Sequence, residues 1–200
     1  MKISGISLLI TISLVLLFDR SFAQKSIYNY VITNNNDTIR CEMRTTLFGA
    51  IKYQAITSTG KFIKVTTKEI KEYYTAKDSS TYVVVTLPEQ DSPEYLKLLE
   101  RGKISFYEKL IVSYSQYGNN RSYYWYVSKD GGPLKEIKSN TIFTDGSRKE
   151  RREYLANLMA EDKALVDEFK NESDFSLKKL TYFIHKYNTD QANNSGTGSK

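Results

Sequence analysis

The apolar residues of this chain change their spacing near Asp145, and this change constrains the fold more than any other feature of the sequence. Before Asp145, short runs of β-branched and aromatic residues alternate with polar ones and are separated by turn residues, which is typical of strands. After it, apolar residues recur every three or four positions, which is typical of amphipathic helices. The sequence therefore predicts an α+β fold in which strands come first and about three helices come last.

The strand-forming part is expected to span 24–144 as a mainly antiparallel sheet. Its turns are as short as those of hairpins, whereas parallel strands would need crossover connections of about a dozen residues. A short helical insertion is expected at 94–100, because Ser92 and Pro93 resemble an N-cap and a first helical residue, and Gly102 follows. The predicted strands are 27–33, 38–45, 50–57, 62–66, 69–75, 82–87, 104–114, 122–127 and 134–137.

The helical part is expected to span 145–187 and to cover one face of the sheet. Ser147 and Glu150 have the spacing of a capping box, which places the start of the first helix there. Residues 188–200 lack large apolar side chains and are predicted to be a disordered tail. The apolar residues expected to face the sheet are Leu155, Leu158 and Met159, then Leu165, Val166 and Phe169, then Leu177, Leu180, Ile184 and Tyr187 with Phe183 beside them.

The first 23 residues predict export from the cytosol. Met1 and Lys2 form a basic start, 3–18 is largely apolar, and small residues up to Ala23 have the spacing of a signal-peptidase site. The apolar run is shorter than the roughly 20 residues of a membrane-spanning helix. We therefore expect 1–23 to be a signal peptide and 24–187 to be a single domain without a transmembrane helix, located in the periplasm, at the outer envelope or outside the cell.

The composition excludes several classes of function. With one His and one Cys, the chain cannot form a His/Cys metal site or a disulfide framework, so neither a metal nor a cofactor is expected. The net charge of +6 is spread along the chain and favours only weak attraction to anionic surfaces. Nucleic acid is not an expected partner, because the sequence has no phosphate-binding loop, RNA-binding run or zinc-finger spacing.

Cys41 and His185 are the one nucleophile–base pair that this composition permits. Ile39, Cys41 and Met43 alternate with charged residues, which predicts a thiol on the apolar face of a strand, where it would be unreactive. His185 lies at the edge of the apolar stripe of the last helix. A catalytic dyad is therefore not expected.

Paired carboxylates offer a second enzymatic hypothesis, a hydrolase of the cell envelope. Glu89 could act with Asp91 or Glu94 as acid and nucleophile. Neighbouring carboxylates are, however, expected by chance in a chain with 23 acidic residues. The sequence favours a non-catalytic protein and assigns no catalytic residue.

Residues 29–39 read Asn-Tyr-Val-Ile-Thr-Asn-Asn-Asn-Asp-Thr-Ile. This segment resembles the opening of a group of uncharacterised exported Bacteroidota proteins, which read roughly Gly-Tyr-Ile-Ile-x-Asn-x-Gly-Asp-Thr-Ile-x-Gly. The stretches 101–108, 123–127 and 187–188 also resemble that group, whereas Asn29, Asn36 and Cys41 depart from its pattern. The resemblance implies an envelope or secreted protein that begins with a β-hairpin, and it implies no activity.

Tyrosine is the enriched residue, with 16 in the chain. In the run Tyr123, Tyr124, Trp125 and Tyr126, consecutive side chains of a strand point to opposite faces. An exposed aromatic face would suit a glycan, peptide or protein, because its rings offer a large rigid area. The alternative is that the rings are ordinary strand formers that pack under the helices.

Arg148, Lys149, Arg151 and Arg152 crowd the first turns of the first helix, where positive charge opposes the macrodipole. They form either a solvated charge run or a contact with an anionic envelope surface. The sequence as a whole favours an exported binding or structural module whose partner is an envelope macromolecule. A further alternative is a structural subunit whose sheet edge pairs with another chain.

Overall fold

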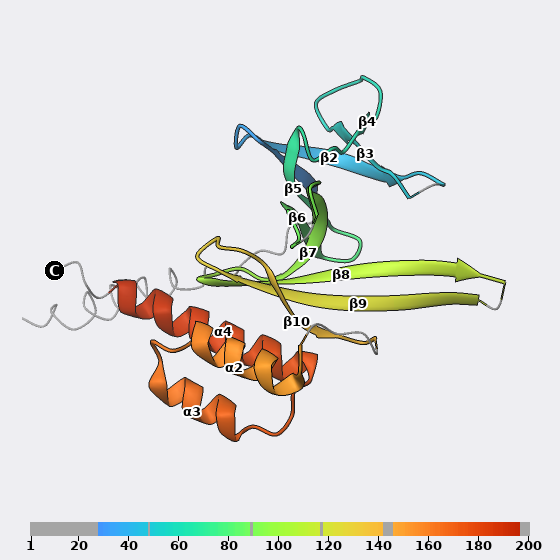
Figure 1. Ribbon diagram of the computed structural model, residues 1–200. Coiled ribbons are helices and arrows are strands. Elements are labelled where there is room, and N and C mark those ends of the chain that lie inside the picture. Colours follow the sequence, from blue (N-terminus) through green and yellow to red (C-terminus); the bar gives the residue numbers. More distant parts are fainter. Residues whose placement is uncertain (1–27, 48, 89, 117, 142–145, 197–200) are drawn as a thin grey trace, which may run out of the picture.

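The computed structural model describes residues 28–47, 49–88, 90–116, 118–141 and 146–196. In these ranges ten strands form one sheet in which neighbouring strands pair antiparallel, and three helices follow (Figure 1). The predicted α+β order of strands and helices is confirmed, and the predicted signal peptide lies outside the described residues. The strands are β1 (Asn29–Thr33), β2 (Thr38–Thr45), β3 (Ile51–Ala55), β4 (Ile63–Lys64), β5 (Ile70–Thr75), β6 (Ser80–Val85), β7 (Glu94–Glu100), β8 (Ile104–Ser115), β9 (Gly118–Lys129) and β10 (Lys135–Ser139).

The sheet is a meander with one exception. Its order is β10-β9-β8-β7-β6-β5-β1-β2-β3-β4, so β1 lies between β2 and β5 rather than at an edge. The turn from β1 to β2 includes Asn36 with φ of 70°, a left-handed conformation that Asn tolerates better than most residues. This explains how Asn36 can occupy a tight hairpin turn without being glycine.

Segment 94–100 is a strand, and the predicted short helix there is wrong. Strand β7 pairs with β6 on one side, where Leu96 lies opposite Val83, and with β8 on the other, where Leu98 lies opposite Tyr107. Both edges of its backbone are therefore used by neighbouring strands. Local propensity is a weak determinant compared with such pairing in the middle of a sheet.

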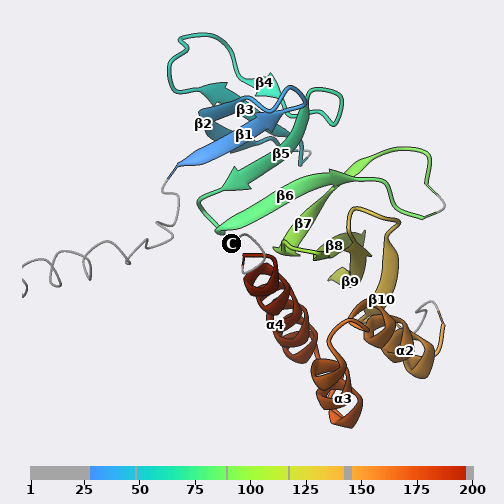
Figure 2. The same cartoon turned by 90° about the vertical axis from the view of Figure 1, so that its left-hand side faces the viewer.

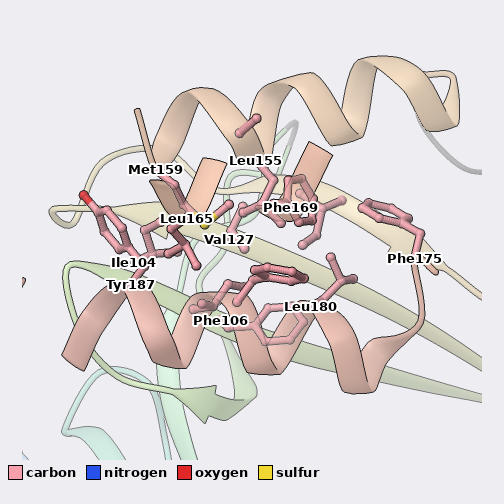
Figure 3. Close-up of a cluster of buried hydrophobic side chains, with 14 of the residues drawn as sticks. Ile104, Phe106, Val127, Leu155, Met159, Leu165, Phe169, Phe175, Leu180 and Tyr187 are labelled. Atoms are coloured by element: carbon pink, nitrogen blue, oxygen red, sulfur yellow. The ribbon is translucent and has the colours of Figure 1, made fainter. Parts of the chain in front are cut away.

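The helices α2 (Arg148–Leu158), α3 (Lys163–Asn171) and α4 (Leu177–Gly196) lie on the side of β8, β9 and β10, as Figure 2 shows. The predicted capping box is present: the Ser147 hydroxyl accepts from the backbone N–H of Glu150, whose side chain accepts from the backbone N–H of Ser147. The predicted apolar faces of the helices are buried or partly buried; α2 and α4 pack against the sheet, whereas α3 packs mainly against α2 and α4. We call the resulting cluster the helix–sheet core (Figure 3); it consists of Ile104, Phe106, Trp125, Val127, Ile137, Leu155, Ala156, Met159, Leu165, Phe169, Phe175, Leu180, Phe183, Ile184 and Tyr187.

A second buried cluster lies in the N-terminal part of the sheet. We call it the strand core; it consists of Val31, Cys41, Tyr53, Val65, Ile70 and Tyr73. Cys41 is 2% exposed within it, as the alternation of its strand predicts. Burial raises the pKa of the Cys41 thiol to about 11, so the thiol is protonated and unreactive at neutral pH.

Helix α4 continues past Tyr187 to Gly196, so the prediction of a disordered tail is wrong for 188–196. Asn188 is buried, and its side chain bonds the backbone of Ile104 at the start of β8. Its Oδ1 accepts from the Ile104 N–H at 2.9 Å, and its Nδ2 donates to the Ile104 carbonyl at 2.8 Å. These bonds give partners to the backbone N–H and carbonyl of Ile104. Ile104 lies beyond the last pair between β7 and β8, which is Glu100 with Phe106.

Candidate binding surface

The aromatic run of β9 is divided between the two faces of the sheet. Tyr123 and Trp125 lie on the helical side, where their rings stack with centroids 5.9 Å apart. Trp125 is part of the helix–sheet core and Tyr123 packs against it. The indole N–H of Trp125 also donates to Glu108 Oε2 at 2.9 Å. These two rings therefore contribute mainly to packing.

Tyr124 and Tyr126 lie on the opposite face and are half-buried. Tyr126 is paired across the sheet with Tyr107 on β8 and Glu136 on β10. Its side chain lines a groove of about 740 Å³, which we call the Tyr126 groove. The groove is lined by Leu87, Pro88, Gln90, Tyr126, Pro133, Leu134, Lys135, Glu136 and Tyr154.

The Tyr126 groove combines aromatic and apolar walls with a few polar groups. Tyr126 comes from β9 and Tyr154 from α2, so the groove lies around the edge strand β10. The ammonium of Lys135 lies 4.5 Å from the centroid of the Tyr154 ring. Burial, followed by the nearby carboxylates of Glu136 and Glu94, raises the pKa of Tyr126 to about 12. The Tyr126 hydroxyl is therefore a hydrogen-bond donor at neutral pH.

Sequence reasoning identified Tyr126 but missed the other walls of this groove. Tyr154 follows a run of charged residues in α2, and nothing in that run indicates that it lines a groove. Asp130, Gly131 and Gly132 form the β9–β10 turn, and the positive φ of Asp130 and Gly131 marks its tight geometry. The Gly-Gly-Pro sequence signals the turn, but nothing in it signals that Pro133 lines the same groove as Tyr154 of α2.

The basic residues at the start of α2 bond backbone carbonyls. Arg148 donates to the carbonyl of Ser173 at 2.6 Å, and Arg151 donates to that of Gly146 at 2.7 Å. Arg152 donates to the carbonyls of Phe169 at 2.9 Å and Glu172 at 2.6 Å. Its charge, unfavourable at the start of α2, is therefore placed at the C-terminal end of α3, where a cation is favourable.

Lys149 differs from its three basic neighbours. Its side chain is 85% exposed and lies 3.9 Å from Glu153, one turn along the helix. Such an exposed pair contributes little to stability. Lys149 thus matches a solvated charge, whereas the arginines are tied to the loops that surround α2.

Cys41 and His185 are not brought together. Cys41 lies in the strand core, and Nδ1 of His185 on α4 is 2.9 Å from Glu100 Oε1. Among the carboxylates of the hydrolase hypothesis, Glu94 bonds Lys109 at 2.6 Å, Asp91 is exposed, and Glu89 lies outside the described residues.

Within the described ranges, no three His, Cys, Asp or Glu side chains gather closely enough to hold a metal ion. No helix in these ranges has the length and apolar character needed to cross a membrane. No protein-family model, no curated protein and no solved structure matches this chain.

Proposed function

We propose that this protein is a non-catalytic binding module of the cell envelope that holds a macromolecular ligand in the Tyr126 groove. The observation that carries the proposal is the groove itself, since about 740 Å³ lies in the usual range of ligand sites. Rings from two separate elements would stack on a ligand, and Gln90, Lys135 and Glu136 would bond its polar groups. A glycan, a peptide or a protein segment has this chemistry.

The polar composition of the groove supports binding rather than hydrolysis. Among the described residues that line it, Glu136 is the one carboxylate. Glycosidases of the common type need two carboxyl groups, separated by about 5 to 10 Å. Export and location in the envelope rest on the sequence pattern of 1–23 and on the resemblance of 29–39.

Binding to purified peptidoglycan sacculi and to arrays of soluble glycans and peptides tests this proposal. We expect the wild-type protein to bind one of these probes, and Tyr126→Ala and Tyr154→Ala to weaken that binding by at least about tenfold, as loss of a buried ring at a binding centre does. Tyr114→Ala is the matched control, because Tyr114 is a 78% exposed tyrosine on β8 that does not line the groove. Melting temperatures of all variants verify that each is folded.

Two outcomes would contradict the proposal. One is a wild-type protein that binds none of the sacculi, glycans or peptides. The other is binding that Tyr114→Ala weakens as much as Tyr126→Ala and Tyr154→Ala do, because the ligand would then not occupy the groove.

The hairpin of β8 and β9 favours a second candidate function, a structural subunit that pairs with another chain. Each strand has 12 residues, but β7 pairs with β8 only as far as Glu108, and β10 pairs with β9 only as far as Tyr124. The remaining ribbon, residues 110–116 and 118–122, extends past its neighbours in Figure 1; we call it the β8–β9 arm. Leu110, Ile111 and Tyr114 are exposed on it, and the outer edge of β8 could accept a further strand.

A further inference from the structure

A second cavity lies where β10, the start of α2 and the segment before α4 meet. It has a volume of about 340 Å³ and shares no lining residue with the Tyr126 groove. Of its lining side chains in the described part of the chain, three are cationic and one is a carboxylate. The cavity is lined by Lys138, Arg148, Arg151, Asp174, Phe175 and Ser176.

The cation that points to a ligand is Lys138. Among the described residues, none forms a hydrogen bond or an ion pair with its ammonium group, which lies 5.7 Å from the centroid of the Phe175 ring. Burial lowers the pKa of Lys138, the positive charges of Arg148 and Arg151 lower it further, and the negative charge of Asp174 raises it. A half-buried ammonium beside two guanidinium groups is destabilised unless an anion joins it.

The one carboxylate of the cavity is already engaged by neighbouring donors. Asp174 accepts from the backbone N–H of Ser176 at 2.8 Å and from its hydroxyl at 2.7 Å. These bonds lower the pKa of Asp174, so its charge is present at neutral pH. Among the described lining residues, one negative side chain therefore stands beside three positive ones.

The geometry of the surrounding elements adds to the positive charge of these side chains. The guanidinium of Arg148 is held by the carbonyl of Ser173, which uses one of its five N–H donors. Ser176 precedes α4, and its hydroxyl accepts from the backbone N–H of Lys179 at 3.3 Å. The positive end of the dipole of this 20-residue helix therefore lies at the cavity.

We propose that this cavity binds an oxyanion, a phosphate or sulfate group, through Lys138, Arg148 and Arg151. The group is either free in solution or part of a lipid headgroup, since both present the same tetrahedral oxygens. The site goes beyond the proposed function, because its residues are separate from the Tyr126 groove. The proposed site differs from a diffuse anion contact along the basic run of α2. Its anion-binding residues include Lys138 and exclude Lys149 and Arg152.

Calorimetric titration with inorganic phosphate and with sulfate, at constant ionic strength, tests the site. We expect Lys138→Gln to weaken binding by about tenfold, the loss of one charge-assisted hydrogen bond. Lys149→Gln removes the same charge from the exposed face of α2 and should change the affinity by less than about twofold. Lys138→Gln removes charge repulsion, so its melting temperature should not fall, and weaker binding would not reflect unfolding.

Vesicles of phosphatidylglycerol and of phosphatidylcholine separate the two sources of the anion. If the headgroup is the ligand, the protein binds phosphatidylglycerol vesicles and Lys138→Gln releases it, whereas Lys149→Gln does not. If a free anion is the ligand, phosphate or sulfate binds more weakly to Lys138→Gln than to Lys149→Gln, and binding to the vesicles shows no such difference. No binding to any of these probes, or equal weakening by the two variants, would overturn the proposal, and neither result would bear on ligand binding in the Tyr126 groove.

Discussion

Asn188 ties the last helix to the sheet through a single amide. Its two hydrogen bonds reach Ile104, 84 positions earlier in the chain. Gly102 makes room for it, because a Cβ on Gly102 would lie 2.3 Å from Asn188 Cγ. At this position glycine is required by the close approach of a side chain rather than by backbone conformation.

Asn188→Ala should lower the free energy of unfolding by about 1 to 3 kcal/mol, because the buried N–H and carbonyl of Ile104 would lose their partners. Urea denaturation measures the change. Asn157→Ala, at an exposed position of α2, should stay within about 0.5 kcal/mol of the wild type. Equal stability of the two variants would show that the Asn188 amide does not hold α4 in place.

At the scale of elements, the turn between α2 and α3 is fixed by Glu161. Its carboxylate accepts from Lys103 at 2.6 Å, from Lys129 at 3.1 Å and from the Tyr187 hydroxyl at 2.7 Å. These donors are the residue that precedes β8, the last residue of β9 and a residue of α4. One carboxylate therefore connects the helical layer to two strands of the sheet.

The contribution of Glu161 to stability should depend on pH. The hydrogen bond from Lys103, followed by those from Tyr187 and Lys129, lowers the pKa of Glu161 from 4.5 to about 2. A depressed pKa in the folded state stabilises the protein above the unfolded pKa, and this stabilisation is lost as the pH falls through the folded one. The stability advantage of the wild type over Glu161→Gln should thus be full above about pH 5 and shrink towards pH 2.

Urea denaturation of both proteins across this pH range measures the difference. Glu153→Gln is the control, since Glu153 is exposed and its one ion pair, with Lys149, spans 3.9 Å. Its difference from the wild type should stay small at every pH. An advantage over Glu161→Gln that is constant from pH 5 to pH 2 would rule out the linkage.

Sequence patterns predicted the elements whose signals are local. The capping box of α2 and the apolar stripes of all three helices are confirmed, since each depends on residues within a few turns of one another. Strand β7 was mispredicted because Ser92 and Pro93 imitate a helix start, and because its sequence, Glu-Tyr-Leu-Lys-Leu-Leu-Glu, does not alternate apolar and polar residues. The Tyr126 groove and the cavity lined by Lys138, Arg148 and Arg151 each combine distant elements, so no local pattern could have predicted them.

At the scale of the whole molecule, the sheet carries two separate cores and one projection. The helix–sheet core lies under β8, β9 and β10, and the strand core lies among β1, β2, β3 and β5, apart from the helices in Figure 2. The β8–β9 arm extends beyond both cores. A ribbon of two strands is only marginally stable alone, so a further strand on its edge would add to its order.

Pairing of the arm with a second copy of the chain is the first case to test, by sedimentation velocity over a range of concentrations. The N–H of Ile104 bonds Asn188 rather than β9, so every second residue from it, including Val112, directs its backbone N–H to the outer edge of β8. Val112→Pro should therefore abolish self-association and leave the ladder with β9 intact. Ser113→Ala should associate like the wild type.

A wild-type protein that sediments as a monomer at every concentration would remove self-pairing. Association that persists unchanged in Val112→Pro would place the contact elsewhere on the molecule. The melting temperature of Val112→Pro should remain that of the wild type, because the arm lies outside both cores.

The position of β1 between β2 and β5 also determines when the sheet can form. Strands β5 to β10 join neighbour to neighbour, but the pairing of Tyr30 with Tyr74 must close a long loop, which slows assembly. A chain that leaves the ribosome or a translocation channel amino end first offers β1 with one edge open until β5 follows. That interval is when a nascent chain of this topology is most exposed to mispairing, and when a chaperone would have most to protect.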